Sequence, residues 1–359
     1  MKTRNLAAWA CATMGFGILA VTVAAGSAPA PMLGLLDKFT AANVPTTGPS
    51  ESPVPFRPTT QPATMPTWPG AGLAGHPFLY GGEGLNSMSL VVGGKVVWTY
   101  GTGAAGEIDD AWMLSNGNVL FTSMNYVAEI TPDKKVVWRF DCPAGTQCHS
   151  VQPIGLDKAL IVNNGLPNPM MMMFDTTTGK VIWQHALDTQ STTDAKTVHA
   201  QIRNARMTSA GTFLVPYMEL GKVVEYDKDW KQIFTVNAVQ PWAALRVPSG
   251  NILIAGNGAG WAREVDRTGK TVWEVTKNQL PGITLRTVQG ISRLANGDTI
   301  ISSNGKPTAQ NIKASVQMVQ VTPDNKVVWV IQDWEHLGPG SWIQLLDEPG
   351  IPENGDVLR

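Results

Sequence analysis

The sequence predicts an all-β protein in which six four-stranded sheets form a closed ring, and the first observation behind this is a repeated phrase. A tight turn is followed by Lys, two apolar or β-branched residues and Trp, as in Gly94-Lys95-Val96-Val97-Trp98. The phrase recurs at a spacing of roughly 40 to 55 residues, a period typical of propellers and other repeat arrays. Further copies are Lys135–Trp138, Lys180–Trp183, Lys270–Trp273 and Lys326–Trp329, with a degenerate copy at Lys231–Phe234. We therefore expect a six-bladed β-propeller.

Composition is the second observation. The 359 residues include 36 Gly and 25 Pro, and 15% are charged, which favours many strands joined by tight turns over helices. An apolar fraction of 43% is enough for a sizeable core. A net charge of −1 gives no basic surface, so nucleic acid is not an expected partner.

The N-terminal part predicts export. Lys2 and Arg4 precede an apolar run and small residues that end at Ala28-Pro29-Ala30, the pattern of a signal peptide over residues 1–30. The run is also long enough to serve as an uncleaved membrane anchor, the one membrane contact we expect. Residues 31–75 are rich in Pro and Thr and predict a linker, so the propeller should occupy residues 76–359.

The clearest blade runs from Asp110 to Phe140. Its expected strands are 111–114, 119–121, 127–130 and 135–138, with hairpin turns at Asn116-Gly117 and Pro132-Asp133-Lys134. The same layout recurs around Leu156-Asp157, Ala210-Gly211, Ser249-Gly250 and Asn296-Gly297. The Trp on each outermost strand is expected to pack against the neighbouring blade.

The sixth blade is expected to combine the two ends of the domain. Its outer strands would be 89–92 and 95–98, and its inner strands 342–346 and 356–358. Pairing the ends closes the ring and removes exposed sheet edges.

A family resemblance follows from two segments. Phe174 to Trp183 resembles the pyrroloquinoline-quinone-type propeller repeat, Asp-x-x-Thr-Gly-x-x-x-Trp, and Glu264 to Trp273 is a variant one residue shorter. Leu245 to Ile254 and Arg293 to Asp298 are similar to the inner strands of bacterial arylsulfotransferase-like propellers. The resemblance implies the fold, and implies group transfer through a histidine. Quinone dehydrogenases of this type have eight blades, adjacent cysteines and a calcium site, none of which is apparent here, so no cofactor and no quinone is expected.

Polar residues are predicted to ring one end of the central channel. The turns between strands one and two and between strands three and four are short, whereas the other connections, on the opposite face, are long. His149, His185, His199 and His336 all fall in or beside long connections. Counting seven residues back from each strand one–two turn gives Asp109, His149, Arg203, Trp242 and Gln289, with the sixth position near Ser341 or Trp342. We expect the five to form a ligand site in a shallow funnel, or simply the wet mouth of a propeller.

Three functions remain open. The leading interpretation is an exported, periplasmic or extracellular propeller that binds a small polar molecule, a glycan or a partner segment at its long-loop face. The alternative is an arylsulfotransferase-like enzyme using His149, and a third is a scaffold for envelope proteins. Cys142 and Cys148 predict a disulfide just before His149, although free thiols are also possible, and no metal site is predicted.

Overall fold

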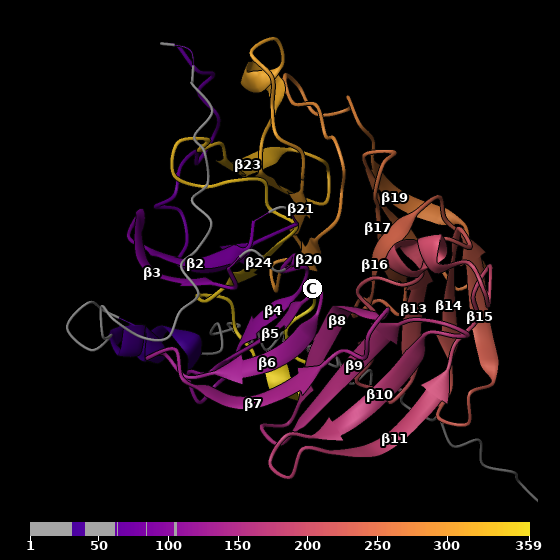
Figure 1. Cartoon of the computed structure of the whole chain (residues 1–359). Helices are drawn as coiled ribbons and strands as arrows, with labels where there is room; N and C mark the ends of the chain where they lie inside the picture. The colour runs from indigo at the N-terminus through magenta and orange to yellow at the C-terminus, as the bar shows by residue number, and fades with distance from the viewer. Residues whose placement is uncertain (1–30, 40–61, 63, 84, 104–105) are drawn as a thin grey trace, which may run out of the picture.

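The computed structural model describes residues 31–39, 62, 64–83, 85–103 and 106–359. Its strands form six four-stranded antiparallel sheets around a common axis, which is a six-bladed β-propeller (Figure 1). This confirms the predicted fold class.

Blades one to five follow chain order, each from its innermost to its outermost strand. Blade one is β4 (Ala111–Met113), β5 (Val119–Ser123), β6 (Tyr126–Ile130) and β7 (Val136–Asp141), and blade two is β8 (Gln147–Ile154), β9 (Lys158–Asn164), β10 (Met170–Asp175) and β11 (Lys180–Ala186). Blade three is β12 (Arg206–Met207), β13 (Phe213–Tyr217), β14 (Lys222–Tyr226) and β15 (Gln232–Asn237). Blade four is β16 (Pro241–Arg246), β17 (Ile252–Gly256), β18 (Trp261–Val265) and β19 (Thr271–Val275), and blade five is β20 (Ile291–Arg293), β21 (Thr299–Ser302), β22 (Met318–Val321) and β23 (Val327–Ile331).

Blade six joins the two ends of the domain, but not in the predicted proportion. Its order is β24 (Trp342–Leu345), β1 (Phe78–Gly81), β2 (Ser87–Val92) and β3 (Lys95–Gly101), so three strands come from the start and one from the end. Phe78 pairs with Leu345 and Gly81 with Trp342. The expected inner strand at 356–358 is wrong, because the short buried run Phe78–Gly81 takes its place.

The end of the sequence lies inside the ring instead. Leu358 forms a bridge with Arg293 beside blade five, and the C mark of Figure 1 lies among the innermost strands. The Arg359 guanidinium lies 3.9 Å from the ring centre of Trp112 and 3.5 Å from Asp110, which also pairs with Arg206 at 2.8 Å. These side chains fill the channel, so the ring encloses a packed polar centre.

The repeated Trp joins each blade to the next. The Trp98 indole N–H donates to the Pro132 carbonyl of blade one, and Trp138 lies against Phe174 of blade two. Trp183 meets Phe213 of blade three in the same way. The prediction that these residues pack between blades is therefore confirmed.

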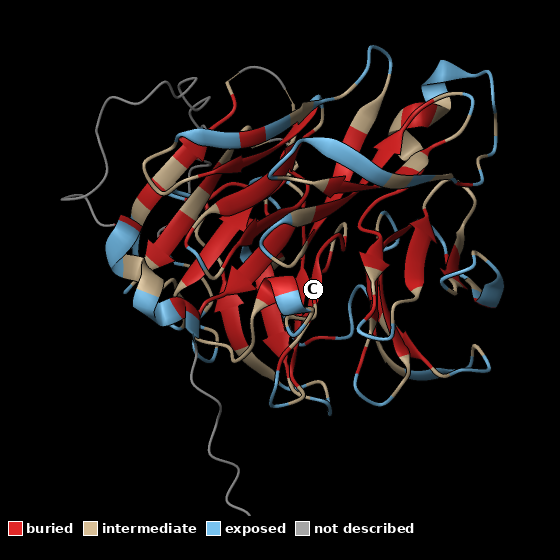
Figure 2. Ribbon diagram, turned by 90° about the horizontal axis from the view of Figure 1, so that it is seen from below, coloured by how far each residue is buried: buried red, intermediate tan, exposed pale blue. Residues whose placement is uncertain are grey.

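A β-bulge stands directly before this aromatic residue in all six blades. The register between the third and outermost strands skips Val97, Val137, Ile182, Ile233, Val272 and Val328. The bulge changes the alternation of side chains, so the aromatic residue points inward while the preceding residues stay on the outer edge. Val137, for example, is 53% exposed next to Trp138 at 7%. Figure 2 shows the same gradient, with buried inner strands and exposed outer edges.

Buried acids on the third strands have a structural explanation. Glu129, Glu225 and Glu264 lie opposite the outer-strand aromatic residue and accept hydrogen bonds from Asn118, Thr212 and Asn251, each directly after the glycine of the strand one–two turn. In blade five the same position holds Gln320, which donates to Asp298 at 2.8 Å. These residues stabilise hairpins, so we do not count them among the candidate functional residues.

Described residues before 76 also touch the propeller. The 3₁₀ helix η1 (Pro31–Phe39) buries Met32 and Phe39 against blade six, with the Phe39 and Trp98 rings 5.4 Å apart. Trp68 donates to Gln332 at 3.1 Å. The division of the chain into signal, linker and propeller stays a prediction, and the signal peptide lies outside the described residues. Within the described ranges, no helix is long and apolar enough to cross a membrane.

The pairing of β24 with β1 predicts how truncation affects folding. Deleting residues 342–359 should abolish cooperative unfolding, because β1 loses its partner and the ring opens. Deleting only residues 347–359 keeps β24, so that variant should stay folded with a lower melting temperature, since Asp110 loses Arg359. Thermal melting followed by circular dichroism compares both with the full chain. A 342–359 deletion that melts like the full chain would contradict closure through β24.

Candidate functional site

The five residues of the predicted ring lie together at the long-loop end of the channel, but they are not open to solvent. Asp109, Arg203 and Gln289 come two or three residues before the innermost strands, and His149 and Trp242 lie near the start of theirs. Each of the five is 1% exposed. Ser341, at 0%, takes the sixth position. The expectation of a shallow open funnel is therefore wrong, because loops and the side chains of Glu83, Glu107 and His199 lie over the ring.

A chain of hydrogen bonds links the first two ring residues to His199. Asp109 Oδ2 lies 2.5 Å from His149 Nδ1, and His149 Nε2 lies 2.9 Å from Gln147 Oε1. The same amide oxygen lies 3.0 Å from Nδ1 of His199, in the last turn of the 3₁₀ helix η2 (Ala195–Ala200). Because an amide oxygen only accepts, both imidazoles donate to it. His199 therefore carries its proton on Nδ1, and none of the described residues donates a hydrogen bond to its Nε2.

Arg203 and Trp242 form the next part of the ring. The guanidinium lies 4.7 Å from the Trp242 ring centre, within the range of a cation–π contact, and donates to the His199 carbonyl. Arg203 Nε, Trp242 Nε1 and Asp109 Oδ1 have no hydrogen-bond partner in the described part of the chain. Buried polar atoms of this kind are costly unless something else satisfies them.

Gln289 connects the ring to Glu83. Its Oε1 accepts from Ser341 Oγ and Asn304 Nδ2, each at 2.6 Å, and its Nε2 donates to Glu83 Oε2. Asn304 donates to the same Glu83 oxygen at 3.2 Å. This amide network fixes one carboxylate at the channel mouth.

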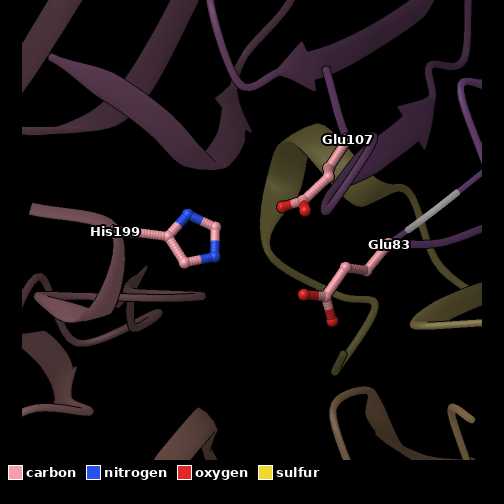
Figure 3. A group of neighbouring side chains, drawn as sticks. All are labelled: Glu83, Glu107 and His199. Carbon is pink, nitrogen blue, oxygen red and sulfur yellow. The ribbon is translucent and has the colours of Figure 1, made fainter. Parts of the chain in front are cut away.

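Three side chains stand above the ring and face one another. Glu83 lies in the β1–β2 connection, Glu107 in the β3–β4 connection and His199 in the β11–β12 connection. One ligand-type atom from each lies within 4.8 Å of the other two. Figure 3 shows the two carboxylates on one side and the His199 ring on the other, with one ring nitrogen pointing toward them. All three remain partly exposed.

Sequence reasoning placed His199 on the right face but missed both glutamates. Glu83 follows the strand that was not recognised, and Glu107 lies outside the seven-residue register that selects only innermost strands. The signals that could have found them are Gly81-Gly82-Glu83-Gly84, a Gly-rich connection, and Glu107 two residues before Asp109.

Burial controls the electrostatics of the cluster. It is the main cause that raises the pKa of Glu107 to about 7, with further contributions from the Asp109 and Glu83 carboxylates. Burial also raises the pKa of Asp109 to about 6. The pKa values of His149 and His199 are lowered, first by burial and then by the Arg203 charge. A 2.5 Å contact between Asp109 and His149 needs one proton between the two atoms, so this pair is neutral overall.

The remaining residues singled out from the sequence are two histidines and two cysteines, and none of them belongs to the cluster. His185 stacks on Trp230 with ring centres 3.7 Å apart, and His336 is exposed beside Asp333. The structure has no bond between Cys142 and Cys148, although their sulfur atoms lie only 2.8 Å apart. The disulfide therefore stays a prediction.

A hollow of about 370 Å³ is lined by residues of the long connections on the same face. Its lining includes the basic side chains of Lys277 and Arg286 and no carboxylate. Thr287, also in the lining, donates to the Asn304 carbonyl, and the Asn304 side chain contacts Glu83. Thr287 and Asn304 therefore connect the basic hollow to Glu83.

Comparisons with known proteins give the fold. No protein-family model and no curated protein matches the sequence. A solved structure of a protein of unknown function from Bacteroides caccae is similar over 75% of this chain and 97% of its own, with 22% identity and a TM-score of 0.67. A streptogramin B lyase structure covers 84% of this chain and 93% of its own, with 12% identity and a TM-score of 0.53.

These likenesses show the β-propeller fold alone. The WD40 β-propeller domain of Doa1 is a more remote match, at 15% identity over 63% of this chain and 71% of its own, with a TM-score of 0.47. No match supports the pyrroloquinoline-quinone-type or arylsulfotransferase-like resemblance, which stays a prediction.

The burial of the ring predicts the effect of truncating its aromatic member. Trp242→Ala should lower the free energy of unfolding by about 3–5 kcal/mol, because a fully buried indole is lost. Val239→Ala, at a position 65% exposed, is the control and should change stability by less than about 0.5 kcal/mol. Urea denaturation measures both, and equal stability of the two variants would show that Trp242 packs little.

Glu107 predicts a pH effect whose sign follows from its raised pKa. The folded chain holds this proton more tightly than the unfolded chain, so the contribution to stability is full below pH 4.5 and is lost as pH rises through about 7. Glu107→Gln should remove this contribution, so wild type minus variant melting temperature should fall by roughly 2–4 °C between pH 5 and pH 8. Differential scanning calorimetry in the presence of a chelator measures both melting temperatures. A wild type minus variant difference that rises with pH would contradict the raised pKa of Glu107.

Proposed function

We propose that the protein is an exported binding propeller that holds a small polar ligand at the centre of its long-loop face. The observation that supports this is the convergence of polar side chains from all six blades at the channel mouth. Glu83, Glu107 and His199 point toward one another there, above a fully buried polar layer.

Stability alone does not account for this arrangement. Arg203, Asp109 and Trp242 each bury a polar atom that has no hydrogen-bond partner among the described residues, and the partly buried carboxylates of Glu83 and Glu107 lie close together. An apolar core at these positions would avoid both penalties. Polar groups that are positioned but not satisfied are typical of sites that a ligand completes.

The adjoining hollow gives the ligand its expected charge. Lys277 and Arg286 offer donors to an anionic group, and Thr284, Asn311 and Ser315 offer neutral hydrogen-bonding groups. A sugar-sized ligand that carries a phosphate, sulfate or carboxylate fits this chemistry. Its anionic group would lie in the hollow and its other polar end at the mouth.

The geometry does not favour group transfer through His149. Both ring nitrogens are already bonded, to Asp109 and Gln147, and the side chain is 1% exposed. A nucleophilic or acid–base imidazole needs one nitrogen within reach of the substrate. We therefore assign His149 a positioning role beneath the mouth.

Binding of charged sugars tests the proposal. In a panel of phosphorylated, sulfated, carboxylated and neutral monosaccharides, measured by calorimetry in a chelator, at least one anionic member should bind and the neutral members should bind more weakly. Lys277→Gln combined with Arg286→Gln should reduce that affinity at least tenfold, because both cations line the hollow.

Lys180→Gln is the matched control, since Lys180 is an exposed lysine at the start of β11 and away from the hollow. It should bind like the wild type. If no anionic sugar binds, or if the double variant binds as tightly as the control, the proposed ligand class is wrong.

A further inference from the structure

The geometry points to a divalent metal ion bound by Glu83, Glu107 and His199, an inference that rests on the proposed function because the ion would form part of the same ligand site. One atom from each residue lies within 4.8 Å of the other two. Bonds of about 2.0–2.2 Å place the ligands of one ion roughly 3–4 Å apart, so small side-chain rotations are enough to close this triad on a cation.

The tautomer of His199 is the first independent argument. Gln147 Oε1 lies 3.0 Å from Nδ1 and fixes the proton there, which leaves Nε2 as a lone-pair donor on the side of the carboxylates. Metal-bound histidines usually donate their other ring N–H to an oxygen acceptor in this way. Gln147 is itself held by His149, which is held by Asp109, so the imidazole is oriented by a buried chain.

Unsatisfied polar atoms are the second argument. Asp109 Oδ1 and Glu107 Oε2 are buried and lack hydrogen-bond partners among the described residues. Asp109 is 1% exposed, and its carboxylate forms a second close group with Glu107 and His149 directly beneath the triad. A cation bound above this layer would interact favourably with these unpaired oxygen atoms.

The ligand set indicates the class of metal. One imidazole and two carboxylates suit Zn²⁺ or Mn²⁺ better than Ca²⁺ or Mg²⁺, which prefer all-oxygen sites. Three protein ligands leave at least one coordination position open. With Arg203⁺ beside two carboxylates, a bound dication gives the mouth a net positive charge, which would attract the anionic ligand.

Metal binding alone tests the inference. The chelator-treated full chain is titrated with Mn²⁺ and binding is monitored by electron paramagnetic resonance, which should show one tight site. Added Zn²⁺ should displace the bound Mn²⁺, whereas Ca²⁺ should not. In the wild type, Mn²⁺ should broaden the ring protons of His199 and leave those of exposed His336 sharp. No tight Mn²⁺ or Zn²⁺ site, or broadening of His336 alone, would overturn the proposal.

Substitutions give the second readout. Glu83→Gln, Glu107→Gln and His199→Gln should each weaken Zn²⁺ binding at least about 100-fold, whereas Glu335→Gln, at an exposed position on the same face, should not. Gln147→Leu should weaken binding about tenfold and Gln147→Glu should restore it, because a carboxylate oxygen also accepts from Nδ1. Unchanged affinity in the three triad variants would place the metal elsewhere.

The two proposals fail separately. If a charged sugar binds in the presence of a chelator, and if the double substitution of Lys277 and Arg286 removes that binding, the ligand site is supported even when no metal binds. Tight Zn²⁺ binding that depends on the triad supports the metal site even if no sugar in the panel binds.

Discussion

Closure of the ring is the constraint on which the rest of this structure depends. A four-stranded blade exposes two apolar faces, and each is covered only by the blade on either side. The aromatic residue on each outermost strand, Trp in five blades and Phe234 in blade three, packs in this interface, as the Trp98 contact with Pro132 and the Trp138 contact with Phe174 show. Pairing of β24 with β1 completes the sheet of blade six and so closes the ring, which makes packing in every blade depend on a junction between residues more than 250 positions apart.

The same closure creates the candidate site. Innermost strands of equal orientation start at one face, so residues from distant parts of the sequence meet there without any local signal that requires it. Asp109 and His149 are in different blades and share a proton, and Arg203 reaches Trp242 of the next blade. The rigid ring holds these polar groups close together despite the unfavourable free energy of burying them.

The sequence predicted well wherever a feature repeats. Six copies of the Lys-to-aromatic phrase gave the blade count, and a constant distance from each strand one–two turn found the five ring residues. Features outside the repeat were missed. Phe78–Gly81 is a four-residue strand that borders a Pro-rich segment, and its burial comes from pairing with β24, which local sequence does not reveal. Glu83 and Glu107 belong to connections, whose paths depend on tertiary contacts, so their approach to His199 required the structure. The same loops explain why the ring is buried rather than open.

The bulge before each outer aromatic residue also affects whether copies of the protein aggregate at high concentration. In blades one to four the outermost strand is a sheet edge with partly exposed valines or isoleucines, such as Val137, Ile182, Ile233 and Val272, a combination that invites strand-to-strand association between molecules. An extra residue in each of these strands breaks the regular spacing of backbone donors and acceptors. A second molecule therefore meets an irregular edge at each of these strands. Removing one bulge residue, such as Val137, would straighten an edge and make the protein prone to fibrous self-assembly, although the blade would gain a more regular ladder.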